Sequence, residues 1–160
     1  MKLQKGTIMP GTKLKSFLDE NHIEYVTISH SPAYTAQRTA EITHISGQEL
    51  AKTVIVKQDG EFAMAVLPAS KRIDLDYLKR GVEADNVEIA TESEFEGLFP
   101  DCEVGAMPPF GNLYDLDVYV AEKLTEDEEI AFNAGTHTEL VQMPFKDYEK
   151  LVHPKVIQLT

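Results

Sequence analysis

The chain has 160 residues, of which 42% are hydrophobic and 26% charged; this balance excludes collagen-like and disordered chains and predicts a single domain, residues 1–160. Its 15 Lys and Arg residues against 27 Asp and Glu give a formal net charge of −12, which excludes broad, sequence-independent binding to nucleic acid or anionic lipid. A polyanion that docks by one end stays compatible with this charge, because Lys71-Arg72 and Lys79-Arg80 lie close together in the sequence.

The first two predicted elements are a helix and a strand. From Gly11 to Asn21, apolar side chains recur at the i, i+3, i+4 spacing of an amphipathic helix. From Glu24 to Ser29, β-branched and aromatic residues indicate a strand. The strand is expected to end at Ser31-Pro32, because the residue before a proline is held in extended geometry.

Two short helices are predicted next. The first covers Thr35 to Ile42. Ser46 and Glu49 then have the spacing of a capping box, which marks the start of a helix. We expect this second helix to end near Lys52 and to give way there to a strand.

A β-hairpin is predicted over residues 53–67. Two apolar runs, Thr53 to Lys57 and Glu61 to Leu67, flank the dipeptide Asp59-Gly60. Asp-Gly supplies the positive φ angles that a tight turn between strands requires. Both runs are almost continuously apolar, so we expect both faces of each strand to be covered.

The second half of the chain interleaves helices and strands. Helices are predicted from Asp74 to Lys79 and from Glu92 to Leu98, where Thr91 and Glu94 offer a capping box. A last helix, Phe145 to Leu151, follows a proline, which the first helical turn tolerates. The later strands are Asp117 to Ala121, Glu129 to Asn133 and Thr138 to Met143. This order predicts an α+β fold with a mixed sheet flanked by helices.

The single cysteine and the lengths of the apolar runs indicate in which cellular compartment the protein is expected. Cys102 has no partner for a disulfide within the chain, which fits a reducing environment. The longest apolar run, Phe62 to Leu67, is far shorter than the ~18 residues of a membrane span. Met1 to Pro10 carries polar residues where a secretory signal has an apolar segment. We expect a cytoplasmic protein without membrane contact, and a monomer by default.

Several common catalytic motifs are absent from the sequence. It has no Gly-x-Gly-x-x-Gly segment after a strand, no phosphate-binding P-loop and no Gly-x-Ser-x-Gly elbow. The five histidines form no His-x-x-x-His pair, and there is no second cysteine for a zinc site. We therefore expect no metal and no cofactor. Asp101 and Glu103 flank Cys102 and raise the pKa of its thiol, which disfavours a nucleophilic cysteine.

Two glycine-containing segments are candidates for a site. The segment from Gly105 to Gly111 holds two prolines, which fix the backbone angles. Such a loop would present its carbonyl oxygens in a preset geometry to a small polar ligand. A stiff surface connection is the alternative interpretation. Asn133 to His137 is a turn between two apolar strands that carries a hydroxyl and an imidazole, and an ordinary hairpin turn is the alternative for it.

Lys52 and Tyr34 are the other candidate side chains. A lysine at the start of a covered strand can act as a point cation for phosphate or for developing negative charge, unless its amine simply extends to solvent. Tyr34, in the turn from His30 to Thr35, can stack on a ligand or pack into the core.

Taken together, these segments resemble the YbaK family, which includes the editing domain of bacterial prolyl-tRNA synthetases and free-standing relatives. The resemblance runs from about His30 to Tyr148, and the order and spacing of its marks make it specific. The marks are the turn His30 to Thr35, Ala51-Lys52-Thr53 before a strand, Leu67-Pro68-Ala69-Ser70, the Gly-x-x-x-Pro loop at Gly105 to Pro109, and Gly135-Thr136-His137. It implies an α+β fold with a partly barrel-like sheet.

The resemblance also implies hydrolysis of the ester between an amino acid and the terminal adenosine of a tRNA, without a metal or a protein nucleophile. Lys52 would hold the terminal phosphate or polarise the ester, and the backbone of Gly105 to Pro109 would position the aminoacyl group and the attacking water. His137 would line the aminoacyl pocket or orient the adenosine. The implied catalytic residues are Lys52, Gly105, Pro109 and His137. The implied substrate-binding residues are His30, Tyr34, Thr35, Ser70, Ala106, Met107, Phe110, Gly135 and Thr136.

The expected substrate is a small amino acid on the acceptor end of a tRNA. Alanine on proline tRNA is the first expectation, with Cys, Ser or Thr open, because one methylene in an apolar pocket discriminates by only ~1–3 kcal/mol. A prolyl-tRNA synthetase or an elongation factor would deliver the substrate, and no DNA partner is expected. Two rival hypotheses are a non-catalytic module that binds an aminoacyl-adenosine-like ligand or regulates a synthetase, and a thiol enzyme based on Cys102.

Overall fold

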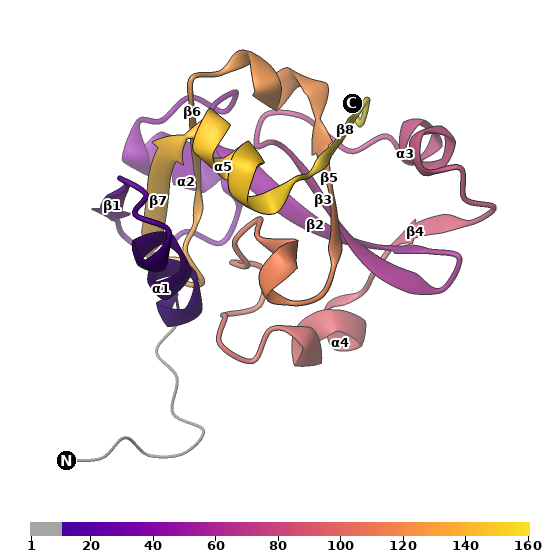
Figure 1. Ribbon diagram of the computed structural model, residues 1–160, viewed down its shortest axis with the longest axis horizontal. Coiled ribbons are helices and arrows are strands. Elements are labelled where there is room, and N and C mark those ends of the chain that lie inside the picture. Colours follow the sequence, from indigo (N-terminus) through magenta and orange to yellow (C-terminus); the bar gives the residue numbers. More distant parts are fainter. Residues whose placement is uncertain (1–10) are drawn as a thin grey trace.

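Two β-sheets and five α-helices make up residues 11–160, the part of the chain that the computed structural model describes (Figure 1). The expectation that Met1 to Pro10 carries no secretory signal concerns residues outside this range. In the described part of the chain, none of the helices has the length and apolar character that crossing a membrane requires.

The larger sheet has five strands in the order β4-β2-β3-β5-β8. The strands are β2 (Ala51–Gln58), β3 (Glu61–Pro68), β4 (Val87–Ile89), β5 (Asp117–Ala121) and β8 (Lys155–Ile157). Strands β4, β2 and β3 pair in antiparallel fashion, whereas β3 with β5 and β5 with β8 are parallel. The sheet is therefore mixed, as the sequence predicts.

The β2–β3 hairpin confirms the turn prediction. Asp59 and Gly60 have φ angles of 50° and 86°, the two positive values of a tight hairpin turn, and Gln58 pairs with Glu61. Strand β3 is buried on both faces from residue 63 to residue 68, as expected for its apolar run. In β2, residues 52–54 are only half-buried, so one end of this strand stays accessible.

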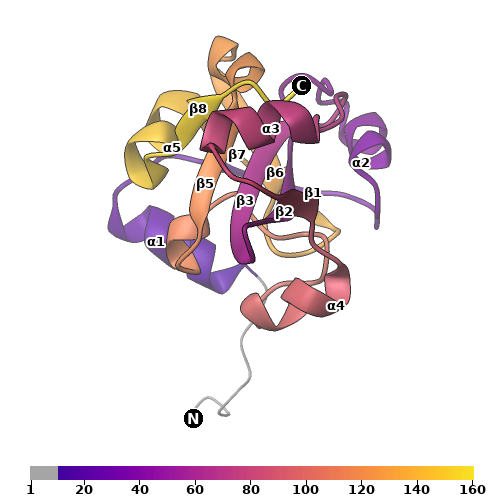
Figure 2. The ribbon, with the colours of Figure 1, turned by 90° about the vertical axis from the view of Figure 1, so that its right-hand side faces the viewer.

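The two faces of the larger sheet are covered by different elements. Helix α3 (Leu75–Val82) crosses one face and buries Leu78 against Val56 and Ala65 (Figure 2). Met64 on the opposite face joins the main core. The second sheet and α5 (Phe145–Val152) contribute to this main core, so β3 lies in the middle of the molecule.

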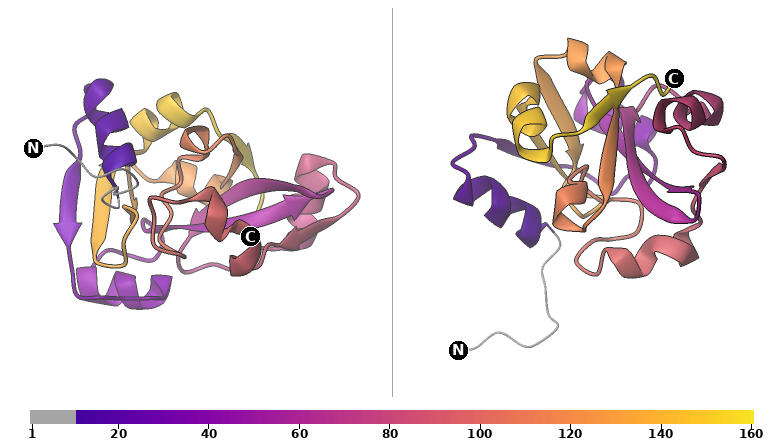
Figure 3. Two further views of the ribbon diagram at one scale, coloured as in Figure 1. Left: turned by 90° about the horizontal axis from the view of Figure 1, so that it is seen from below. Right: turned by 45° about the vertical axis from the view of Figure 1, so that its right-hand side comes forward.

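The smaller sheet is antiparallel, in the order β1-β7-β6. Its strands are β1 (Val26–Ser29), β6 (Glu129–Asn133) and β7 (Glu139–Pro144). Leu50 and Ala131 form an isolated bridge that links the start of β2 to β6. The predicted α+β class is confirmed, and among the described residues the two sheets meet at this bridge without closing into a barrel (Figure 3).

The remaining helices lie at the margins of the sheets. They are α1 (Thr12–Glu20), α2 (Ala36–Thr43) and the short α4 (Glu92–Phe95), which continues as a 3₁₀ turn to Leu98. Thr91 and Glu94 form the predicted capping box. Thr35 caps α2, because its side-chain oxygen accepts a hydrogen bond from the backbone N–H of Arg38.

The helix predicted to end near Lys52 is absent. Ser46 does accept a hydrogen bond from the N–H of Glu49, but the chain makes only one turn there and enters β2 at Ala51. Strand β2 contains the β-branched residues 53–56 and pairs with β3 over eight residues. These two features outweigh the local capping signal. Lys52 is therefore the second residue of a strand and does not follow a helix.

Candidate functional site

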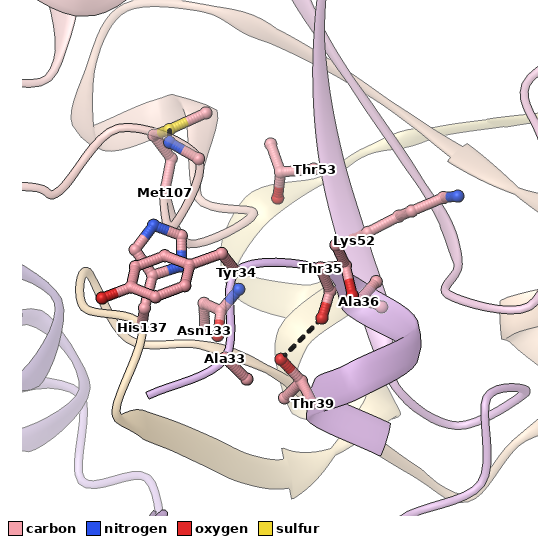
Figure 4. Close-up of a pocket in the computed structure, with 12 residues that line it drawn as sticks. Ala33, Tyr34, Thr35, Ala36, Thr39, Lys52, Thr53, Met107, Asn133 and His137 are labelled. Atoms are coloured by element: carbon pink, nitrogen blue, oxygen red, sulfur yellow. Dashed lines mark hydrogen bonds between the residues drawn. The ribbon is translucent and has the colours of Figure 1, made fainter. Parts of the chain in front are cut away.

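A small cavity of about 180 Å³ opens where the two sheets diverge, beside the N-terminus of α2 (Figure 4). Four stretches far apart in the sequence form its walls: residues 33–36 with Thr39, residues 51–53 of β2, Gly105 with Met107, and Asn133 with His137. Ligand pockets for drug-sized molecules occupy roughly 300–1,000 Å³, so this cavity fits a group the size of an amino-acid side chain better than a nucleotide.

Backbone hydrogen bonds join the turn before α2 to the β6–β7 turn. The N–H of His30 donates to the carbonyl of Thr138 at 2.8 Å, and the N–H of Ala33 donates to the carbonyl of His137 at 3.1 Å. The side chain of Thr39 donates to the carbonyl of Thr35 at 3.0 Å, which fixes the first turn of α2. One wall of the cavity is thereby held by the main chain.

His137 is buried and its ring is held in one orientation. Its Nε2 lies 2.8 Å from the carbonyl oxygen of Val104, and its backbone N–H donates to the carboxylate of Glu103 at 2.8 Å. A carbonyl only accepts, so Nε2 carries the proton and Nδ1 is the nitrogen left to accept from a ligand or a water. The ring centroid of Tyr34 is 4.8 Å away, which places an exposed aromatic at the mouth of the cavity.

Gly105 lies against the His137 ring. Its φ is 89°, and a Cβ at this position would stand 3.4 Å from Cε1 of His137. The position therefore requires a glycine for its backbone angle and brings the loop close to the imidazole.

From Ala106 to Gly111 the loop is buried and Gly105 is exposed, so the segment is not the surface connection of the alternative interpretation. Two of its carbonyls are engaged within the protein and are not available to a ligand: that of Ala106 accepts the N–H of Gly135, and that of Pro109 accepts the hydroxyl of Tyr148 at 2.7 Å. Gly105 and Met107 are the loop residues that line the cavity.

Lys52 lies between this cavity and an adjoining cationic groove. Its side chain extends away from His137 and Met107 in Figure 4. The groove has a volume of about 310 Å³ and shares Lys52, Thr35 and Ala36 with the cavity. Its further lining residues are Gln37, Ala69, Ser70, Lys71 and Arg72.

The positively charged side chains of this cationic groove have no acidic partners among the described residues. Lys52, Lys71 and Arg72 form no salt bridge within residues 11–160. Burial lowers the pKa of the Lys52 ammonium below its usual value, and repulsion from Arg72 lowers this pKa further. An anion bound between these side chains would relieve the repulsion, which makes the groove suited to a phosphate.

The structure brings about half of the sequence-predicted residues to the cavity or the groove. Lys52, Gly105, His137, Tyr34, Thr35 and Met107 line the cavity, and Ser70 lines the groove. Ala106 and Phe110 are fully buried; the Phe110 ring packs in the core against Phe132 and Tyr148, so these two side chains do not edge the cavity as expected. Pro109, His30, Gly135 and Thr136 lie outside both linings and hold the surrounding turns.

Sequence reasoning missed Thr39, Thr53 and Asn133 as lining residues. Asn133 had a usable signal, because it is the polar end of an otherwise apolar strand that runs into the Ala-Gly-Thr-His turn. Thr39 follows the predicted Thr35 by one helical turn, which puts both on one face of α2. Thr53 carried no signal, since its residue type is typical of any strand.

Cys102 lies outside the cavity and the groove. Burial raises the pKa of its thiol to about 11, and the neighbouring Asp101 carboxylate adds to the shift. The sulfur lies 3.4 Å from the hydroxyl of Tyr114, which itself donates to Asp101. Such a thiol is not a nucleophile near neutral pH, which removes support from the thiol-enzyme hypothesis.

The fold brings together a small cavity with polar walls and an adjoining groove lined by Lys52, Lys71 and Arg72. The family model of the aminoacyl-tRNA editing domain matches residues 30–151, and the chain belongs to this family. The predicted family and the predicted class of enzyme, a hydrolase of aminoacyl-tRNA esters, are thereby confirmed.

Individual relatives agree with this assignment. The chain is 25% identical over 160 residues to the multifunctional Ser/Thr-tRNA deacylase ProXp-y of Escherichia coli (strain K12), covering 97% of this chain and 95% of the relative. A proline–tRNA ligase of Staphylococcus haemolyticus (strain JCSC1435) is 33% identical over 87 residues, which span 54% of this chain and 14% of the ligase.

Solved structures share the fold. A crystal structure described as a candidate trans-editing enzyme for prolyl tRNA synthetase superposes with a TM-score of 0.79 at 21% identity, covering 99% of both chains. The hypothetical protein APE2540 gives a TM-score of 0.82 at 19% identity, covering 92% of this chain and 98% of that structure. At these identities the likeness establishes the fold alone.

Proposed function

We propose that this protein removes a small amino acid from the 3′ end of a mischarged tRNA, with the aminoacyl group in the cavity and the adjacent phosphate in the cationic groove. The observation that carries the proposal is the junction of the two: Thr35, Ala36 and Lys52 line both. An aminoacyl-tRNA end has the same layout, since a small polar group is joined through a ribose to a phosphate. The acidic surface elsewhere limits the contact to this end.

The proposed reaction is hydrolysis by water. Water attacks the ester carbonyl carbon, the bond from that carbon to the ribose oxygen breaks, and the water proton ends on the ribose oxygen, which yields a free amino acid and a tRNA. In this proposal Nδ1 of His137 orients the water or the ammonium of the substrate, helped by a ribose hydroxyl. Positioning and electrostatic stabilisation accelerate such a step without a covalent intermediate.

Lys52 holds the terminal phosphate in this proposal. The sequence left open whether its amine polarises the ester or binds the phosphate. The side chain extends away from His137 and Met107 (Figure 4), and Lys52 lines the groove together with Lys71 and Arg72, which favours the phosphate. A hydrogen bond to a charged partner contributes about 1.5–3 kcal/mol, which corresponds to roughly ten- to hundredfold in rate.

The amino acid is proposed to be serine or threonine, with alanine on proline tRNA as the competing substrate. Thr35, Thr39 and Asn133 give the cavity polar walls, and the Escherichia coli relative is named a Ser/Thr-tRNA deacylase. The proline–tRNA ligase relative supports a link to prolyl-tRNA, either through the tRNA or through delivery by the synthetase.

The test is a deacylation panel in which one tRNA carries Ala, Ser, Thr, Cys or Pro. We expect the wild type to hydrolyse at least one ester, and Lys52→Ala to lower kcat/KM by up to about a hundredfold while its circular dichroism and melting temperature stay close to wild type. Lys150→Ala, an exposed lysine on α5 that lines neither cavity nor groove, is the control and should keep the wild-type rate. No turnover of any ester would favour the non-catalytic binding module, and an active Lys52→Ala would refute the phosphate role.

A further inference from the structure

Asn133 presents an unused hydrogen-bonding group in the wall of the cavity. It is the last residue of β6, and its side-chain oxygen is buried without any partner within the described residues. Two neighbouring hydroxyls each make one hydrogen bond within the protein: that of Thr35 accepts from Arg38, and that of Thr39 donates to the carbonyl of Thr35 (Figure 4). The amide of Asn133 is thus free to bind a ligand.

The geometry favours a hydroxyl as the group that Asn133 binds. Figure 4 draws the amide nitrogen of Asn133 toward the middle of the cavity-lining residues, where it offers N–H donors. An ammonium only donates, so it pairs with the amide only after the amide turns by 180°, whereas a hydroxyl pairs in either orientation because it both accepts and donates. The cavity is also too small to admit a nucleotide that could compete for this wall.

We propose that Asn133 is a specificity-determining residue that binds the side-chain hydroxyl of a serine or threonine ester. This inference rests on the proposed function and assigns its choice of amino acid to one side chain. An alanine ester leaves the amide without a partner from the substrate. Sites built to bond a substrate hydroxyl reject the analogue that lacks it far more strongly than apolar pockets do.

The experiment compares seryl and alanyl esters of one tRNA on three variants. Asn133→Leu keeps the approximate shape and removes hydrogen bonding, and we expect the ratio of kcat/KM for serine over alanine to fall at least tenfold. Asn133→Asp restores acceptors at the same place, and the ratio should return to within about threefold of wild type. Asn112→Leu, the same change at an exposed asparagine that lines neither cavity nor groove, should keep the wild-type ratio.

The ratio separates the inference from its alternatives. Damage to the fold, or a role of Asn133 in binding the ammonium that both esters share, would lower both rates together and leave the ratio unchanged, which overturns the inference while the proposed function stands. A wild type that does not prefer serine also overturns it. A wild type that hydrolyses neither ester, nor any other in the panel, contradicts the proposed function itself.

Discussion

At the scale of single residues, the site depends on close approach between Gly105 and His137. The imidazole is fixed by its bond to the carbonyl of Val104, the residue just before the glycine. The 89° φ of Gly105 turns the chain there, so that the loop backbone passes the ring at contact distance. The backbone angle of Gly105 therefore sets the path of the loop, and the bond to Val104 holds the ring beside it.

We predict that Gly105→Ala disturbs this pair. An L-residue at such a φ costs about 1–2 kcal/mol, and the new Cβ would stand at contact distance from the His137 ring, so melting should drop by a few degrees. Deacylation should fall at least tenfold, more than the loss of stability accounts for. Cys102→Ser is the comparison, because its thiol lies away from the site and the variant should keep full activity. Wild-type kinetics in Gly105→Ala would show that the close approach is dispensable.

At the scale of elements, local turn and capping signals predicted several elements correctly. Asp59-Gly60 and the box at Thr91 are examples, and β5 and β6 begin and end at the predicted residues. The helix predicted after Ser46 failed because pairing with β3 is a long-range interaction that no local window contains. The three-residue edge strands β4 and β8 are too short to show a period.

The same limit applies to the site. Lys52, Gly105 and His137 stood out by residue type in their segments, and the family resemblance assigned them to the site; all three line the cavity. Ala106 and Phe110 were misplaced, since a sequence does not say which side of a loop faces the core. Asn133 reaches the cavity only because β6 ends opposite β2, and the bridge between Leu50 and Ala131 that brings these strands together connects residues distant in the chain.

The α4 capping box predicts a pH dependence of stability. Hydrogen bonds from Lys57 and from Thr91 lower the pKa of Glu94 to about 2. Because the folded pKa lies below the unfolded value of about 4.3, the stabilisation is complete above that value and is lost as the pH falls through about 2.

Glu94→Gln should therefore melt at a lower temperature than wild type at pH 7, and the difference should narrow steadily from about pH 5 to about pH 3. Glutamine retains the shape of the box, so the change isolates the charge. Thermal melts of both proteins across this range measure the effect, with Glu92→Gln as the control on the same helix. A difference that does not change with pH would mean that the ion pair contributes nothing.

At the scale of the whole molecule, net charge and local charge oppose each other. A chain with a formal net charge of −12 repels the body of a tRNA, while the cationic groove attracts its end. Few phosphates can then be neutralised on binding, at most about as many as the groove has cations. The proposed function therefore predicts contact with the end of the acceptor strand alone.

The salt dependence of kcat/KM measures this number of contacts. Each phosphate contact to a single strand contributes a slope of about −0.7 to a plot of log binding constant against log salt concentration, so the three cations of the groove limit the slope to roughly −2. Arg72→Ala should make the slope shallower by about 0.7. A short acceptor-stem substrate and a full tRNA should give the same slope, because the acidic surface makes no further phosphate contacts. A slope of about −4 or steeper on the full tRNA would place much of its backbone on the protein and contradict recognition by the end alone.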